Sequence, residues 1–272
     1  MLAHIIASGT VPVVRLTEGS PQAAQSRIIT SAHRVNPRLV PDLSKPEGDS
    51  DFCLVPADDP DAAVPLIIAL VKTRIPQRFG LDAIRDIQVL SPMNRGGVGA
   101  RSLNIELRKA LNPAGERKVE RFGGTFAPSD KSIQIVNDCD KEVYNGDIEY
   151  VEDVDPDATE LTASFDGRAA IYGFGELDTL VPAYAATIHR SQGSEYPAVV
   201  MPVMPQHHTT LQRNLLYTGV TRGKRLVVLA GQKKAVAIAV RIVSGCRRWS
   251  KMKEWRAATR TANPSLRHAS AS

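Results

Sequence analysis

The amino-acid sequence predicts an α/β domain with a largely parallel sheet, into which a small β-barrel is inserted. Two observations support this fold class. Over most of the chain, short apolar runs with strand character alternate with helical patterns, which is typical of βα units. In the middle of the chain the helical patterns stop, and closely spaced short strands separated by turn signals replace them.

The first predicted elements are a buried strand at Val11–Leu16 and a helix at Gln22–Val35. Three prolines and a Gly-Asp pair then form a polar break, which we interpret as a boundary near residue 45. Behind it the acidic turn Asp58-Asp59-Pro60 starts an apolar helix. The predicted elements of this part are strand Phe52–Val55, helix Ala62–Val71, strand Ile87–Leu90 and helix Leu103–Leu111.

The middle of the chain reads as four short strands, Ser132–Val136, Ile148–Val151, Leu161–Phe165 and Ala169–Tyr172. Asn145-Gly146-Asp147 and Asp166-Gly167 are strong turn signals between them. These elements predict a small β-barrel inserted over residues 147–182. The α/β alternation then continues through Ala198–Val203, Leu211–Val220, Leu226–Leu229 and Ala235–Ile242, and we expect residues 259–272 to be a disordered tail.

Composition limits the class of protein. The chain has 272 residues, 43% of them hydrophobic, and no uninterrupted apolar run approaches the roughly 20 residues of a membrane span. The N-terminus lacks the pattern of a signal peptide. Three widely separated cysteines without metal-ligand spacing predict a reduced, cytoplasmic protein without a metal site. His207-His208 also lacks ligand spacing and predicts a polar loop.

Charge is distributed unevenly along the chain, although the net charge is only +5. Arg222–Arg260 holds twelve Lys and Arg residues and one acid, whereas Asp138–Asp178 holds thirteen carboxylates and two bases. Such asymmetry often marks a segment facing nucleic acid beside one turned away from phosphate. Two solvated faces of opposite sign would give the same pattern, so charge alone leaves both interpretations open.

Two runs near the end carry the clearest functional signal. Tyr184–Val200 contains Thr-x-His, then Ser-Gln-Gly-Ser-Glu and an apolar strand, and Leu215–Leu229 passes through Val-Thr-Arg into another apolar strand. In this order the pair resembles motifs V and VI of superfamily 1 helicases, specifically the RecD-like 5′→3′ DNA helicases. The resemblance extends from Val11 to about Trp255. It implies that the α/β domain is the RecA-like second motor domain of an ATP-driven helicase.

The resemblance also implies a nucleotide site. Arg222 would be the catalytic arginine that reaches the γ-phosphate of ATP, since a guanidinium offers paired donors and keeps its charge. Gly193 would let the backbone approach the nucleotide, and Glu195 would accept hydrogen bonds from a ribose hydroxyl. ATP and Mg²⁺ are the cofactors implied for the intact helicase, with the metal ligands located outside this chain.

Single-stranded DNA is the partner that the resemblance implies, bound first of all by Thr187 and His189. The strand-to-turn run Val89–Gly97 is similar to motif IVa and implies contacts to the DNA backbone from Ser91, Pro92 and Asn94. A β–turn–α junction needs glycine for chain reversal in any case, so this pattern is also compatible with a purely structural turn. The family's usual lysine after the histidine is Arg190 here.

The departures from the family pattern concern catalysis. The sequence contains no G-x-x-x-x-G-K-[ST] and no acidic metal-holding motif, and Gly19–Gln22 lacks the arginine expected after Leu-Thr-Glu. We therefore expect residues 1–45 to be a remnant of the first motor lobe, residues 46–146 plus 183–258 to be the second motor domain, and this chain alone to be inactive. A first motor lobe or a helicase partner would complete it.

Two alternatives remain open. The chain could be a non-catalytic DNA-binding or partner-binding module derived from such a helicase. It could also be the C-terminal half of a conjugative relaxase-helicase, which shares these motifs.

Overall fold

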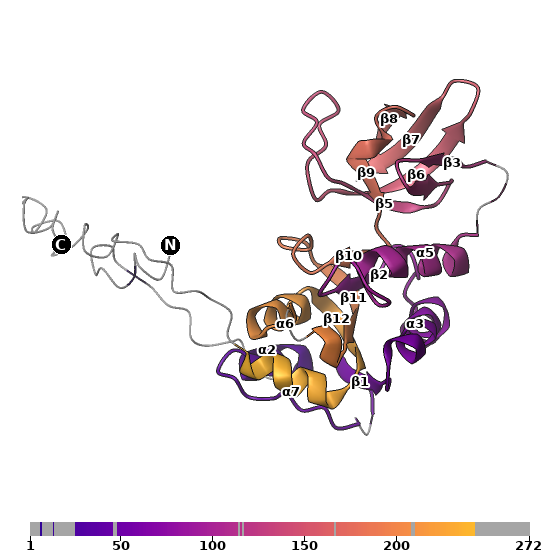
Figure 1. The fold of residues 1–272 in the computed structure, drawn as a ribbon. Coiled ribbons are helices and arrows are strands. Elements are labelled where there is room, and N and C mark those ends of the chain that lie inside the picture. The colour runs from indigo at the N-terminus through magenta and orange to yellow at the C-terminus, as the bar shows by residue number, and fades with distance from the viewer. Residues whose placement is uncertain are drawn as a thin grey trace, which may run out of the picture. The chain divides into compact units, whose positions relative to one another are not determined.

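The structure is a computed structural model that describes most of the chain between residues 25 and 242 (Figure 1). The described residues are 6, 13, 25–45, 48–113, 115, 117–165, 167–207 and 210–242. Apart from Val13, the predicted strand Val11–Leu16 lies outside them, as do the first residues of the predicted helix Gln22–Val35 and the predicted tail.

A parallel sheet of five strands organises the larger part of the fold, in the order β1-β12-β11-β2-β10. Its strands are mostly buried and read as apolar runs because helices cover both faces. The predicted parallel α/β sheet is thereby confirmed. The strands are β1 (Phe52–Pro56), β2 (Ile87–Ser91), β10 (Ala185–Thr187), β11 (Tyr196–Val203) and β12 (Gly223–Gly231).

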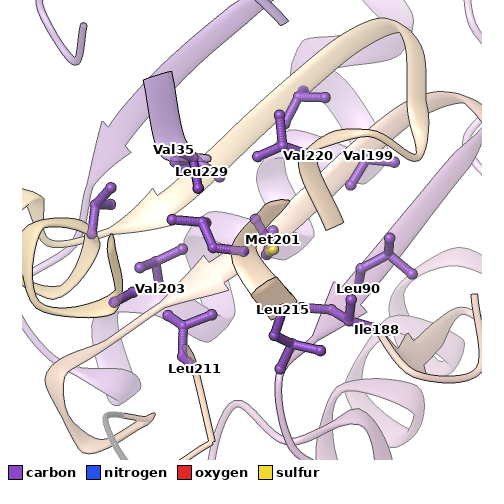
Figure 2. Close-up of a cluster of buried hydrophobic side chains, with 14 of the residues drawn as sticks. Val35, Leu90, Ile188, Val199, Met201, Val203, Leu211, Leu215, Val220 and Leu229 are labelled. Atoms are coloured by element: carbon purple, nitrogen blue, oxygen red, sulfur yellow. The ribbon is translucent and has the colours of Figure 1, made fainter. Parts of the chain in front are cut away.

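Two separate apolar clusters join the helices to the faces of this sheet. One cluster gathers side chains of the strands with those of α2, α6 and α7, among them Val35, Met201, Leu215 and Leu229 (Figure 2). The other gathers the opposite strand side chains with α3, α5 and the π-helical turn η1. The helices and turns are α2 (Arg27–Val35), α3 (Pro60–Ala69), η1 (Leu70–Arg74), α4 (Ile75–Phe79), α5 (Ala100–Leu111), η3 (Pro205–His207), α6 (Arg213–Val220) and α7 (Lys233–Arg241).

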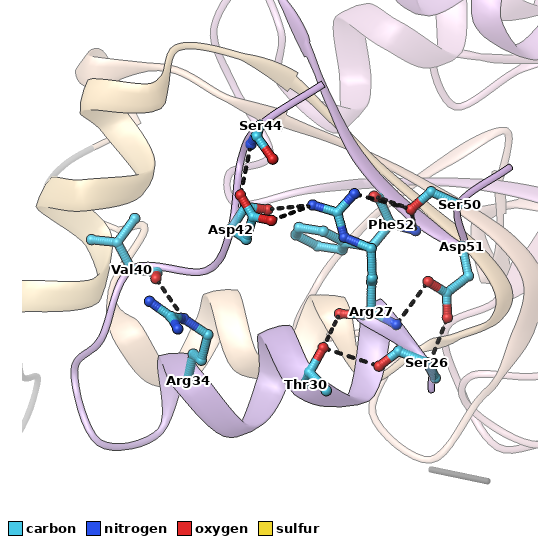
Figure 3. A network of polar contacts seen from close by, with 10 residues as sticks. All are labelled: Ser26, Arg27, Thr30, Arg34, Val40, Asp42, Ser44, Ser50, Asp51 and Phe52. Atoms are coloured by element: carbon cyan, nitrogen blue, oxygen red, sulfur yellow. Dashed lines mark hydrogen bonds and ion pairs between the residues drawn. The ribbon is translucent and has the colours of Figure 1, made fainter. Parts of the chain in front are cut away.

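Helix α2 belongs to this core, although the predicted division at residue 45 separates it from the second motor domain. The helix begins at Arg27 and not at Gln22, because Ser26 accepts a hydrogen bond from Ile29 N and caps it. Ser26 Oγ also donates to Asp51 Oδ2 at 2.5 Å, which ties the helix to the start of β1 (Figure 3). The buried stripe Ile28, Ala32 and Val35 packs in the same cluster as α6 and α7.

The middle of the chain forms antiparallel structure, as predicted. A five-stranded antiparallel sheet has the order β8-β7-β6-β5-β9, and β3 and β4 form a separate hairpin. The sheet includes β5, which lies before the predicted insertion 147–182, because β5 pairs with both β6 and β9. The elements are β3 (Val119–Arg121), β4 (Gly124–Phe126), β5 (Lys131–Gln134), β6 (Ile148–Asp155), β7 (Glu160–Phe165), β8 (Arg168–Gly173), η2 (Leu177–Thr179) and β9 (Leu180–Pro182).

Two buried charged residues at the start of β5 connect the antiparallel sheet to the parallel one. The carboxylate of Asp130 accepts hydrogen bonds from Arg108 Nε at 2.8 Å, from Asn112 Nδ2 at 2.8 Å and from the Tyr184 hydroxyl at 2.7 Å. The Lys131 ammonium donates to Ile84 O at 3.1 Å. Because both side chains are almost fully buried, these bonds fix the position of β5 next to the parallel sheet.

Among the described residues, no helix has the length and hydropathy that a membrane-spanning helix requires.

Candidate functional site

The predicted site residues lie at two opposite edges of the parallel sheet. All five strands run in one direction, so β2 and β10 end at the carboxyl edge with Ser91 and Thr187, while β11 and β12 begin at the amino edge with Tyr196 and Gly223. The segment 188–195 crosses from one edge to the other without a helix. The predicted DNA contacts therefore lie at the carboxyl edge, and the predicted nucleotide contacts lie at the amino edge.

At the carboxyl edge, Ser91 and Pro92 shape a loop that presents Asn94. Ser91 is fully buried, and its hydroxyl donates to Val98 O at 2.9 Å and accepts from Met93 N at 3.3 Å. Pro92 is also buried, whereas Asn94 is exposed. The Ser91 hydroxyl is thus directed into the loop, and of the three residues predicted in this motif Asn94 is the one with an accessible side chain.

The loop closes where Gly99 starts α5, at a position that only glycine fits. A β-carbon at Gly99 would lie 2.5 Å from the carbonyl carbon of Arg95. Within the predicted run Val89–Gly97, Gly96 has a φ of +105°, which also favours glycine, as expected for a strand-to-helix turn.

Thr187 and His189 lie beside this loop. Thr187 pairs with Ser91 in the sheet and is half-buried, and His189 and Arg190 are exposed. Ile188 between them is fully buried in the cluster of Figure 2, and its N–H donates to Ser91 O at 3.0 Å. This anchor holds the side chain of His189 in solvent, next to the loop that carries Asn94.

At the amino edge, Arg222 contacts the end of the segment 188–195. Its Nη1 donates to Ser194 O at 3.0 Å, its Nε to Thr218 O at 3.2 Å and its Nη2 to Thr221 Oγ1 at 3.2 Å. Tyr196 N donates back to Arg222 O at 2.8 Å. The two motifs read from the sequence are therefore in direct contact, and they hold a half-buried guanidinium in one orientation.

Glu195 lies next to this arginine and is paired with Lys224, whose Nζ is 2.9 Å from Glu195 Oε2. The hydrogen bond and charge of Lys224, with a further contribution from Arg222, hold the pKa of Glu195 below its usual value. Gly193 is exposed and has a φ of +91°, with open space where a side chain would stand. The sequence analysis did not include Lys224 in the site, although it lies two residues after Arg222.

This arrangement can contact an anion but cannot by itself hold a metal ion. The cations Arg222 and Lys224 lie near the carboxylate of Glu195. The cations suit a phosphate oxygen, and the carboxylate suits a sugar hydroxyl. In the described part of the chain, no group of three or more His, Cys, Asp or Glu residues could bind a metal. His207 is fully buried, contrary to the predicted polar loop, because its Nδ1 accepts a hydrogen bond from Met204 N inside the fold.

Comparisons with known proteins match two parts of this chain to helicase domains. Residues 182–230, which hold β10, β11 and most of β12, match the UvrD-like helicase C-terminal domain. Residues 103–165 match the ATP-dependent RecD-like DNA helicase SH3 domain. The chain is 33% identical over 228 residues to the ATP-dependent RecD2 DNA helicase of Deinococcus radiodurans, an alignment that covers 84% of this chain and 30% of that protein.

A second relative is the RecBCD enzyme subunit RecD of Mycolicibacterium smegmatis, 29% identical over 164 residues, which are 60% of this chain and 28% of that protein. A crystal structure of Pif1 helicase from Bacteroides in complex with ADP-AlF3 and ssDNA aligns with a TM-score of 0.48 at 14% identity, over 93% of this chain and 56% of that one. The chain thus spans about three tenths of the length of these two curated relatives. By its matched domains, their order and its long alignment with RecD2, this chain belongs to the RecD-like helicases, of which it holds the C-terminal region.

Proposed function

We propose that this chain is the second motor lobe of an ATP-dependent DNA helicase, which binds single-stranded DNA at the carboxyl edge and contacts ATP at the amino edge. The observation that carries the proposal is the segment 188–195. It begins beside Thr187 at one edge and ends in the hydrogen bond between Ser194 O and Arg222 at the other. One short segment thus connects the two proposed sites, as a motor that couples nucleotide state to DNA position requires.

At the amino edge, Arg222 is the proposed catalytic arginine. Its guanidinium is held by carbonyl and hydroxyl acceptors on three sides, so it would meet the phosphate of a nucleotide in a preset orientation. Glu195 would accept from a ribose hydroxyl, and the open space at Gly193 would admit the nucleotide close to the backbone. ATP, when bound, would supply the phosphoryl group whose transfer drives motion.

The phosphate cradle and the magnesium ligands would come from a first lobe, either on a longer polypeptide or on a partner. This part of the proposal follows from the absence of a G-x-x-x-x-G-K-[ST] run in the sequence. We therefore expect highly purified chain to release no phosphate from ATP, with or without DNA.

At the carboxyl edge, Asn94, Thr187 and His189 are the proposed DNA contacts. Hydroxyl, amide and imidazole groups can donate to phosphate oxygens, and the exposed Arg190 adds a positive charge. Contacts of this kind carry no base preference. Binding should therefore be weak, independent of sequence and sensitive to salt.

The test is a titration of labelled oligo(dT) with the full chain at about 50 and about 200 mM salt. Affinity should fall steeply between the two. A Thr187→Ala/His189→Ala double variant should bind about 5- to 30-fold more weakly, since two phosphate contacts of roughly 0.5–1 kcal/mol each are lost. The matched control is Thr30→Ala/His33→Ala, which removes the same two residue types from the exposed face of α2. Salt-insensitive binding, or equal losses in the two double variants, would contradict the assigned surface.

A non-catalytic module is the second candidate, favoured by the missing arginine in Gly19–Gln22 together with the missing phosphate-binding motif. The coding sequence directly upstream separates the candidates. An in-frame phosphate-binding loop supports the motor, a relaxase domain supports a relaxase-helicase, and a stop codon with neither supports the module.

A further inference from the structure

An exposed phenylalanine occupies the tip of the β3–β4 hairpin. Phe122 is 64% exposed and has a φ of +50°, and Gly123 after it has a φ of +75°. Positive φ at both central residues of a two-residue hairpin turn favours Asn, Asp or Gly, and a bulky aromatic is unfavourable there. The ring of Phe122 is therefore exposed to water, and neither the backbone conformation nor the solvation of the ring favours phenylalanine at this position.

The hairpin tip lies close to the carboxyl edge of the parallel sheet. Arg101, in the first turn of α5, makes the connection. Its backbone N–H donates to Asn94 O at 3.1 Å, and a β-carbon at Gly123 would lie 3.8 Å from its Nη2. Gly123, which follows Phe122 in the turn, and the proposed DNA contact Asn94 thus both lie beside Arg101.

The surface around the tip is basic, and its arginines are free to bind a ligand. Arg95, Arg101 and Arg121 are exposed, and within the described ranges their guanidinium groups make no hydrogen bond or ion pair. The acid of the hairpin, Glu120, is already paired with Lys118 at 2.9 Å. An exposed ring among unpaired guanidinium groups suits a ligand that combines flat apolar faces with negative charge.

We propose that Phe122 stacks on a base of single-stranded DNA while Arg101 and Arg121 bind the phosphates beside it. The inference rests on the proposed function and extends its DNA surface from the carboxyl edge to the hairpin. Base stacking on an aromatic side chain is tolerant of sequence, since every base has a flat face. The hairpin would therefore add affinity without base preference, and it would distinguish bases from the bare sugar–phosphate chain.

The experiment compares two labelled strands with the full chain, oligo(dT) and a strand of equal length whose central residues are abasic. The key variant is Phe122→Gly, because glycine adopts the positive φ of the turn freely and removes the ring without straining the hairpin. It should weaken oligo(dT) binding about 5- to 100-fold and leave binding to the abasic strand unchanged. Phe122→Trp should restore oligo(dT) binding. Compared with the unaltered chain, which already contains Trp249 and Trp255, this variant should show additional quenching of tryptophan fluorescence by oligo(dT) and none by the abasic strand.

The control is Ile171→Ala, which removes a comparably exposed apolar side chain (54%) from β8 and should change neither affinity. Loss of binding in Phe122→Gly to both strands alike would overturn stacking. Stacking would also be overturned if Phe122→Gly bound oligo(dT) unchanged while Thr187→Ala/His189→Ala still lost affinity. That outcome would leave the carboxyl-edge proposal standing and assign the ring to a protein partner. Absence of any DNA binding by the unaltered chain would overturn both proposals.

Discussion

The two edges of the parallel sheet differ in how their polar groups are satisfied. At the amino edge, Arg222 donates to Ser194, Glu195 is paired with Lys224, and Lys131 donates to the carbonyl of Ile84. At the carboxyl edge, the side chains of Asn94, His189 and Arg190 are exposed and make no hydrogen bond or ion pair with the residues that the structure describes.

The difference separates two tasks. Paired polar groups hold an arginine in one orientation and fix the antiparallel sheet in place, and their removal should disturb structure or preorganisation. Unpaired polar groups on well-anchored elements remain available to a ligand, and their removal should change binding alone. Variants that alter one edge at a time test whether the two edges have these separate roles.

The largest effect is expected from Arg222→Ala at the amino edge. When a first motor lobe of RecD-like type is supplied, joined upstream or added as a separate chain, DNA-stimulated phosphate release should fall by about 10³-fold or more, since an arginine at the transferring phosphoryl group contributes on that order. Binding of oligo(dT) should change less than about twofold, because the arginine lies at the opposite edge from the proposed DNA contacts. Phosphate release and DNA affinity are measured on the same preparations.

The matched control for this variant is Arg225→Ala, which removes an exposed arginine three residues further along. It should leave phosphate release within about twofold of the unaltered protein. Equal losses in the two variants would mean that general positive charge, and not the orientation of Arg222, is responsible. A large loss of DNA affinity in Arg222→Ala would show that the two edges do not act separately.

A smaller but still large effect on stability is expected from Asp130→Ala. This change leaves Arg108 without its partner in a nearly buried site and removes an acceptor for Asn112 and Tyr184. Breaking a buried ion pair in this way destabilises by roughly 3–5 kcal/mol. Asn94→Ala at the carboxyl edge should stay within about 0.5 kcal/mol, because an exposed side chain without a partner is lost. Urea unfolding followed by circular dichroism gives both free energies, and similar values for the two would contradict the proposed division between the edges.

Sequence alone could predict four of the five strands of the parallel sheet, because burial on both faces leaves an apolar run, as in the predicted Ala198–Val203 within β11. It did not predict β10, which has only three residues and ends in the polar Thr187. It predicted a strand at Ser132–Val136 but left it outside the insertion 147–182, since β5 joins the antiparallel sheet only through pairing with strands further along the chain. It extended α2 too far toward the N-terminus because the pattern does not show that Ser26 caps the helix.

For the candidate site, the resemblance predicted roles for Thr187 and Arg222 but did not show that they lie at opposite edges of the sheet, which depends on strand order and direction. It also could not show that the Ser91 hydroxyl is directed into its own loop, since that bond to Val98 O forms only when the turn closes. Local motifs thus provide candidate residues, whereas the position and orientation of their side chains depend on tertiary pairing.

The smallest of the three effects concerns the pH dependence of the amino edge. Burial lowers the pKa of Lys131 to about 8 from 10.5, although the charges of Asp82 and Asp86 oppose the shift. Between these two values the unfolded chain binds a proton that the folded chain does not, so the stability that Lys131 contributes is present above about pH 10.5 and is lost as the pH falls through about 8. The free energy of unfolding changes by about 3 kcal/mol at most over this range.

The variant Lys131→Met keeps a long side chain without a titrating group. It should flatten the rise of the free energy of unfolding between pH 8 and 10 relative to the unaltered protein. Urea unfolding at pH 8, 9 and 10 measures the slope. If the two slopes are equal, Lys131 stays charged in the folded state, and the amino edge must be open to water at that position.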